Sequence, residues 1–261
     1  MHSISILQNG NTAMHLCKID HENRYIFTKE PNLIINIKNN SAGWVIKTSQ
    51  RCEIIVGDGC TVICGNECTI SAGSNCNVHT GYNCSVLVNY YCTITTQDNC
   101  KIFSMGRRST IKGGDKCTVV ITGGSSHVVS GHNSTIDVGS FCTIQSGAYC
   151  KISCESECEL HTGRGCDITS DGGCYFSVMG NSTILPSGFN CTLRHRALDD
   201  VTNNTYRLIP HVRAKTKHDL AMDGIMVNVN DYATHCLEPE EGLIFVIQQE
   251  DEWISSESIH L

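Results

Sequence analysis

Small and branched apolar residues alternate along most of this chain with a period of eight. Position one of each octad is most often Cys, position three is apolar and position five is small, as in Cys76, Val78 and Thr80. Alternate residues of an extended strand face the same side, so these positions predict one short strand with an inward face. Position six is often Gly, as at Gly73, and position eight is often Asn or Gly, as at Asn75. We expect a tight corner there, with a positive φ at position six.

The repeat extends through nineteen octads when an occasional nine-residue step is allowed. Position one is Cys in fourteen octads, Ser in four and Trp in one, and position three is apolar in all nineteen. A weaker octad at Ile35 and Ile37 precedes them. The nineteen octads begin at Trp44, Cys52, Cys60, Cys68, Cys76, Cys84, Cys92, Cys100, Ser109, Cys117, Ser126, Ser134, Cys142, Cys150, Cys158, Cys166, Cys174, Ser182 and Cys191.

The octads predict an all-β fold, a two-sided parallel β-solenoid (β-helix) capped at both ends. Eight residues are too few to close a coil, so each coil should contain two octads, or sixteen residues, and neighbouring coils must stack to bury their inner faces. If alternate octads form opposite faces, all four nine-residue steps fall at the same edge. About ten coils at roughly 4.8 Å per strand would extend roughly 45–50 Å. The steps run from Ile35 to Trp44, Cys100 to Ser109, Cys117 to Ser126 and Ser182 to Cys191.

Three segments follow from the extent of the repeat. Residues 1–34 are expected to form an N-terminal cap, residues 35–193 the solenoid, and residues 194–261 a non-repeat capping or interaction segment. Candidate strands in the last segment are 205–210, 224–229 and 242–248. That segment has 12 acidic and 6 basic residues, whereas the rest of the chain is nearly neutral. It is either a solvated capping surface or an acidic contact patch for a basic partner.

Composition narrows the function classes. The net charge of −7 over 261 residues is not that of a nucleic-acid or anionic-membrane surface. No apolar segment has the length of a signal peptide or a membrane span, so a cytoplasmic location is expected and a membrane is not an expected partner. Eighteen cysteines would suit a disulfide scaffold. Ser replaces Cys at four octads, however, which a bridged ladder tolerates poorly, so reduced and buried thiols are predicted.

Three groups of residues are candidates for metal binding or acid/base chemistry. Zinc needs four converging ligands, and no histidine accompanies the C-x3-C-x3-C spacings in the repeat, so small core residues are favoured there. We therefore predict no metal, no cofactor and no catalytic residue, and expect a protein that is not an enzyme. The acid/base groups of the C-terminal segment have no fixed geometry in the sequence. The residues concerned are Cys60, Cys64 and Cys68, then Cys150, Cys154 and Cys158, and finally His211, His218, Asp219, Asp223, His235 and Cys236.

One outward column is unusually apolar. Position four of alternate octads should face solvent on consecutive strands, and here it reads Ile55, Ser71, Leu87, Phe103 and Val120. Contiguous exposed apolar surface marks an interaction site, so Ile55, Leu87, Phe103 and Val120 are the predicted interface residues. Lys101 and Lys151, at outward position two, are expected to border it. The alternative is that residues 194–261 fold back over the column.

The repeat also resembles a known pattern. The strings at 68–73, 92–96 and 142–147 are similar to the C-T-[IF]-x-T-G-x-x repeats of uncharacterised proteins from tailed phages and bacteria. The likeness covers about residues 44–193 and brings no known catalytic residues. This copy is more degenerate than those arrays, and residues 194–261 have no counterpart in them. The resemblance implies a viral or mobile-element origin.

These observations favour a non-enzymatic binding or assembly protein that self-associates or binds a protein partner through the column and the acidic C-terminal segment. One alternative is an acidic decoy that blocks a nucleic-acid-binding protein, as pentapeptide-repeat DNA mimics do. The balanced charge of the repeat region disfavours it. The other alternative is an enzyme with its site in residues 194–261.

Overall fold

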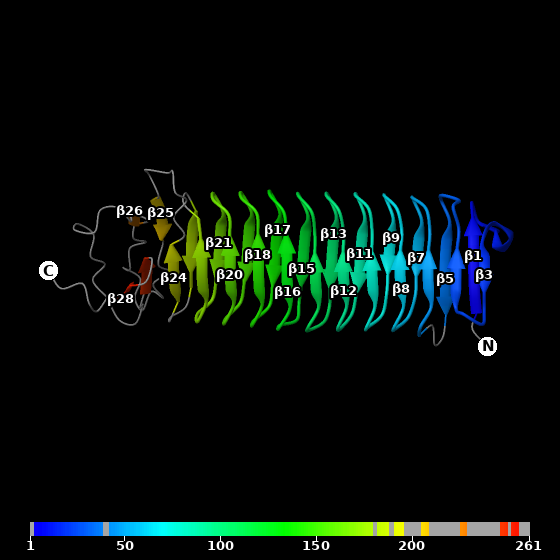
Figure 1. Cartoon of the computed structure of the whole chain (residues 1–261), viewed down its shortest axis with the longest axis horizontal. Helices are drawn as coiled ribbons and strands as arrows, with labels where there is room; N and C mark the ends of the chain where they lie inside the picture. The colour runs from blue at the N-terminus through cyan, green and yellow to red at the C-terminus, as the bar shows by residue number, and fades with distance from the viewer. Residues whose placement is uncertain are drawn as a thin grey trace, which may run out of the picture. The chain divides into compact units, whose positions relative to one another are not determined.

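The computed structural model describes residues 3–38, 42–179, 182–187 and 191–195, together with four later strands at 205–208, 225–228, 246–249 and 252–255. In this part of the chain the only helical element is one 3-10 turn, η1 (Met14–Leu16). Two parallel sheets are stacked as a β-solenoid of about ten coils, each of about sixteen residues (Figure 1). The predicted fold class is therefore confirmed.

The chain comprises two compact units, and the first is Met1–Gly131. From residue 34 onward its strands alternate between the two sheets along the chain, whereas the four strands before residue 34 fall in consecutive pairs, two in each sheet. The first sheet contains β1 (Ser3–Gln8), β2 (Asn11–Thr12), β5 (Ile34–Lys38), β7 (Glu53–Ile55), β9 (Thr69–Ser71), β11 (Ser85–Val88), β13 (Lys101–Ser104) and β15 (Thr118–Ile121). The second sheet contains β3 (Lys18–Asp20), β4 (Tyr25–Phe27), β6 (Val45–Lys47), β8 (Thr61–Ile63), β10 (Asn77–His79), β12 (Thr93–Thr95), β14 (Thr110–Lys112) and β16 (His127–Ser130).

The second unit is His132–Leu261, and its strands alternate between the sheets as far as residue 195, whereas the four later strands fall in consecutive pairs, two in each sheet. The first sheet contains β17 (Thr135–Val138), β19 (Lys151–Cys154), β21 (Asp167–Ser170), β23 (Thr183–Pro186), β25 (Thr205–Leu208) and β26 (Ile225–Asn228). The second sheet contains β18 (Thr143–Ser146), β20 (Glu159–Thr162), β22 (Tyr175–Val178), β24 (Thr192–His195), β27 (Val246–Gln249) and β28 (Glu252–Ser255).

Antiparallel strands stand at the ends of the stack. In the first unit β1 pairs antiparallel with β5 and β3 with β4; in the second unit β26 pairs antiparallel with β25 and β28 with β27. The parallel stack of the second sheet already includes β4, inside the segment assigned to the N-terminal cap. The predicted strands at 205–210 and 224–229 coincide with β25 and β26, and that at 242–248 overlaps β27. Such strands occupy the backbone groups that an open sheet end would expose.

The core is built from positions one, three and five, as Cys84, Val86 and Val88 illustrate with at most 2 % of their surface exposed. The thiols also bond to the backbone. The Cys68 N–H donates to Sγ of Cys84 at 3.4 Å, and that thiol donates to the Gly65 carbonyl at 3.3 Å. All seventeen cysteines in the described part of the chain are free of disulfide bonds, and sixteen of them are buried. The prediction of buried thiols is thus confirmed.

The corners differ from the prediction. The left-handed residues are at position eight, as in Asn75 (φ 57°) and Tyr91 (φ 58°), and position-six glycines such as Gly73 do not have a positive φ. Gly73 is needed for a steric reason, because a Cβ there would lie 2.8 Å from the backbone N of Asp58 in the preceding coil. The expectation of positive φ at position six was therefore wrong. Close coil stacking selects glycine at position six, and chain reversal requires the left-handed residue at position eight.

The nine-residue steps fall where the two-sided fold requires. Ile102 pairs with Val119, and Ile94 pairs with Ile111, so the register continues across each extra residue. All four steps connect a strand of the first sheet to the next strand of the second sheet: β5 to β6, β13 to β14, β15 to β16 and β23 to β24. The predicted single edge is confirmed, and in the first unit it includes the corner that follows β13.

Candidate interaction surface

The predicted apolar column exists as a continuous row on the first sheet of the first unit. Ser71 pairs in register with Ile55 on one side and with Leu87 on the other. Leu87 in turn pairs with Phe103, and Phe103 pairs with Val120. Successive strands β7, β9, β11, β13 and β15 therefore each contribute one residue to the row (Figure 1).

Only two side chains of this row are well exposed to solvent. Leu87 is 37 % exposed and Phe103 is 39 % exposed, whereas Ile55 and Val120 are half-buried. Val86 and Val88, the neighbours of Leu87 along β11, are fully buried, as the alternation of a strand requires. Leu87 and Phe103 are thus the exposed centre of the column, and neither is covered by another segment of the described chain.

The two neighbouring corners beside this centre carry three further apolar side chains, which the prediction of the column did not include. Tyr90, Tyr91 and Met105 are about half exposed and follow β11 and β13. The corners are close together: a Cβ on Gly106 would lie 2.6 Å from Cα of Tyr90, and the Tyr91 N–H donates to the Arg107 carbonyl at 3.1 Å. The sequence signal was the presence of two tyrosines at positions seven and eight, where outward polar residues are usual. We call Leu87, Phe103, Tyr90, Tyr91 and Met105 the apolar patch.

Positive charge borders the apolar patch. Lys101 is exposed on β13, two residues before Phe103, and Arg107 and Arg108 are exposed directly after the corner. Lys151, the other predicted border residue, lies on β19 in the second unit. Basic side chains around an apolar centre give the arrangement of a protein interface, with a desolvated core and a hydrated rim.

In the second unit the same position-four column is mostly polar. Asp137, Ser153 and Thr169 pair in register along it, and Leu185 follows them. The large exposed apolar side chains of this unit lie instead at corners, at Phe141 and Tyr149. Polar residues at the column positions leave this sheet face solvated, so the apolar patch belongs to the first unit.

Two histidines of the second unit make hydrogen bonds to a neighbouring corner or within their own strand. His132 Nδ1 accepts a hydrogen bond from the Ala148 N–H at 2.9 Å. His161 Nε2 lies 2.9 Å from Oε1 of Glu159 on the same strand. Both line a depression of about 690 Å³ that Arg164 also borders. The C-terminal candidates His211, His218, Asp219, Asp223, His235 and Cys236 lie outside the described residues.

Comparison with protein-family models, with curated proteins and with solved structures found no match. Within the described ranges, no helix has the length and apolar character needed to cross a bilayer. The fold is that of a β-solenoid repeat protein. The apolar patch on its surface is the feature from which a function can be inferred.

Proposed function

We propose that this chain is a non-enzymatic binding or assembly protein that self-associates through the apolar patch. The observation that supports it is the side-by-side exposure of Leu87 and Phe103 on neighbouring strands. Covering apolar surface stabilises a complex by roughly 25 cal/mol per Å² before the cost of association. A monomer gains nothing from such surface, so a partner that covers it is expected.

A two-fold homodimer is the simplest partner. In a two-fold interface the same patch serves both subunits, so one apolar surface is sufficient for assembly. Tyr90, Tyr91 and Met105 are residue types enriched at interface centres, where rigid aromatic rings and adaptable thioethers pack well. Lys101, with the arginines after the corner, would remain hydrated at the rim and oppose unspecific stacking of the sheet.

The proposal includes a reducing, cytoplasmic location. Sixteen buried thiols in the described chain are compatible with a compartment that keeps cysteines reduced. A viral or mobile-element origin, which the resemblance of the repeat implies, belongs to the same proposal.

Molar mass measured by light scattering across a range of protein concentrations tests self-association. We expect the wild-type chain to approach the mass of a dimer, and Leu87→Asp with Phe103→Asp to remain monomeric because two carboxylates would be buried at the contact. The matched control is His79→Asp with Thr95→Asp. These residues pair in register on β10 and β12 in the second sheet.

Each outcome bears on the proposal. The control should dimerise as the wild type does. A wild-type chain that stays monomeric at the highest concentration contradicts self-association. Equal loss of dimer in both double variants would place the contact elsewhere or indicate a general effect of added charge.

A further inference from the structure

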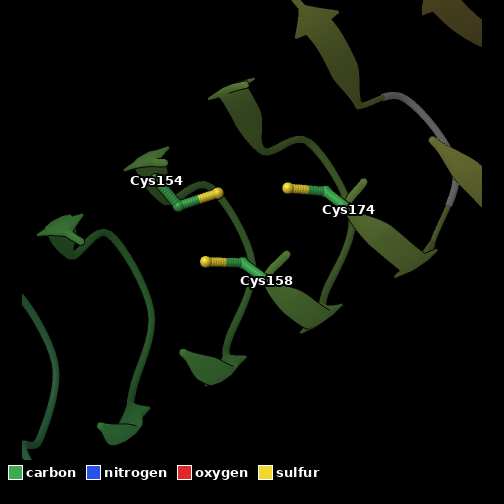
Figure 2. Close-up of side chains that lie close together, drawn as sticks. All are labelled: Cys154, Cys158 and Cys174. Carbon is green, nitrogen blue, oxygen red and sulfur yellow. The ribbon is translucent and has the colours of Figure 1, made fainter. Parts of the chain in front are cut away.

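Three buried thiols converge in the second unit. The Sγ atoms of Cys154, Cys158 and Cys174 all lie within 4.8 Å of one another, and none of the three residues is more than 5 % exposed. Figure 2 shows the three sulfur atoms close together, with the side chains of Cys154 and Cys174 pointing toward each other and that of Cys158 running alongside Cys174. Among the described residues, this is the one group of three or more His, Cys, Asp or Glu side chains that are close enough to hold a metal ion together.

The fold assembles this trio from both sheets. Cys158 and Cys174 begin the octads that contain β20 and β22, neighbouring strands of the second sheet. Cys154 is the last residue of β19 in the first sheet, at position five, so the following corner brings it against Cys158. The C-x3-C-x3-C spacing suggested Cys150 as the third member. Cys150 instead belongs to the ladder of the first sheet, where its N–H donates to Sγ of Cys166 at 3.4 Å.

Backbone groups orient the sulfur atoms. Cys158 donates to the Gly139 carbonyl at 3.3 Å, and Cys174 donates to the Glu155 carbonyl at 3.2 Å. In addition, the Cys142 N–H donates to Sγ of Cys158 at 3.4 Å. These hydrogen bonds fix the positions of the Cys158 and Cys174 sulfur atoms next to Cys154.

The spacing suits a three-coordinate soft ion. Three thiolates about 2.3 Å from a central ion lie about 4 Å from one another, so the trio needs to contract by less than about 1 Å. Thiolates select soft ions such as Cu(I) and zinc. Zinc prefers four ligands, and the described chain places no fourth His, Cys, Asp or Glu side chain in this group. Three-coordinate Cu(I) is therefore the better match.

A cavity reaches one member of the trio, Cys154. Its volume is about 470 Å³, and Cys154, Ser170, Asp171 and Leu185 are among its lining residues. Ser170 pairs in register with Cys154, is 5 % exposed, and its Oγ has no hydrogen-bond partner. The position-five hydroxyls of Thr96, Ser130 and Thr162 likewise have no partner, so this feature belongs to the repeat and the trio itself carries the argument for a metal site.

We propose that Cys154, Cys158 and Cys174 bind one soft, thiophilic metal ion as a three-thiolate site, with Cu(I) as its cognate ion. Each thiol that becomes a ligand releases its proton to solvent, and no electron is transferred because the ion enters as Cu(I). The site is independent of the apolar patch, which lies in the first unit, so the two proposals can fail separately.

Competition with a chromogenic Cu(I) chelator under anaerobic, reducing conditions tests the site on the full chain. Excess chelator leaves only the tightest protein site loaded, so the ladder thiols do not contribute. We expect one equivalent of Cu(I) for the wild type and a loss of affinity of more than about a hundredfold for Cys154→Ser, which removes a ligand rather than a supporting group. X-ray absorption should show three sulfur ligands at about 2.3 Å.

The matched control is Cys64→Ser. Cys64 also occupies position five and forms side-chain hydrogen bonds with Cys68 and Cys84, but these three do not form a group within 4.8 Å. Cys64→Ser should retain the wild-type affinity, and circular dichroism checks that both variants are folded. Equal affinity in Cys154→Ser and the wild type overturns the proposal. Equal losses in the two variants, or tighter binding of Zn(II) with four ligands than of Cu(I), also overturn it.

Discussion

The side chain of Leu87 on β11 lies beside that of Phe103 on β13, because these residues pair in register on neighbouring parallel strands. Both point away from the core and keep more than a third of their surface in solvent. Their contribution to the stability of the isolated chain is therefore small. We therefore expect both positions to tolerate substitution while the coil beneath them stays folded.

We predict that Leu87→Asp with Phe103→Asp lowers the free energy of unfolding of the monomer by no more than about 1–2 kcal/mol, which reflects the weak preference of Asp for strands. Urea unfolding at a concentration where the wild type is monomeric measures it. Val86→Asp is the contrasting variant, since Val86 is fully buried and an unpaired carboxylate there should prevent folding. Similar losses in both would contradict the outward placement of the pair.

The stacked position-one cysteines, which form a ladder of thiols along each sheet, predict that a smaller and a larger residue at Cys84 change the free energy of unfolding by different amounts. Cys84→Ser should lower the free energy of unfolding by about 1 kcal/mol, because a serine at position one can accept the same hydrogen bond. Ser109 Oγ accepts the Cys92 N–H at 3.4 Å, just as Cys84 Sγ accepts the Cys68 N–H. Cys84→Leu adds volume to a filled core and should lower the free energy of unfolding by about 1–3 kcal/mol. Urea unfolding compares the two. A serine variant as unstable as the leucine variant would show that sulfur itself is required.

The corner geometry predicts that a substitution at position six is destabilising, whereas one at position eight, two residues later, is tolerated. Gly73→Ala should lower the free energy of unfolding by about 1–3 kcal/mol, because its Cβ would press on the Asp58 backbone. Asn75→Gly should change it by less than about 0.5 kcal/mol, because glycine adopts the left-handed φ of 57° at that position without strain. Thermal and urea unfolding measure both. Equal destabilisation would contradict the distinct roles of positions six and eight.

The sequence was sufficient for the architecture but not for the geometry of its corners. An eight-residue period with small, branched and small inward residues admits one stacking solution, and the edge of the nine-residue steps followed from pairing octads. Glycine at position six and Asn or Gly at position eight look alike in composition. Only the coil spacing shows that Gly73 avoids a clash whereas Asn75 reverses the chain.

The candidate sites were predictable to different extents. The column of Leu87 and Phe103 follows from strand alternation, which sequence carries directly. The trio of Cys154, Cys158 and Cys174 does not, because its third member comes from the next coil, sixteen residues away from Cys158, and only the stacking register brings them together. Local spacing pointed instead to Cys150, which lies just before β19, at the other end of that strand from Cys154.

Cys17 should be the first thiol labelled among the described cysteines. It is half-buried, whereas the others are buried. Burial raises the pKa of Cys17, and a hydrogen bond with Thr28 offsets part of that increase. Since the thiolate is the reactive form, alkylation should be slow at neutral pH and accelerate as the pH rises past the ordinary pKa of a cysteine. Peptide mass spectrometry after brief iodoacetamide treatment measures it. Earlier labelling of Cys84 would show that the coils open before Cys17 reacts.

A substitution at Met105 tests whether the apolar patch, rather than any exposed apolar corner, forms the dimer contact. Met105 is 56 % exposed beside the Leu87–Phe103 pair, and Phe141 in the second unit is 64 % exposed. In a two-fold dimer every substitution at the contact occurs twice, so Met105→Lys would bury two lysine charges. We expect the dissociation constant of its dimer to rise by at least about a hundredfold, where each tenfold corresponds to about 1.4 kcal/mol. Phe141→Lys should leave the dissociation constant unchanged. Sedimentation velocity over a dilution series measures both constants. Loss of the dimer with Phe141→Lys and not with Met105→Lys would place the interface in the second unit and remove the apolar patch from it.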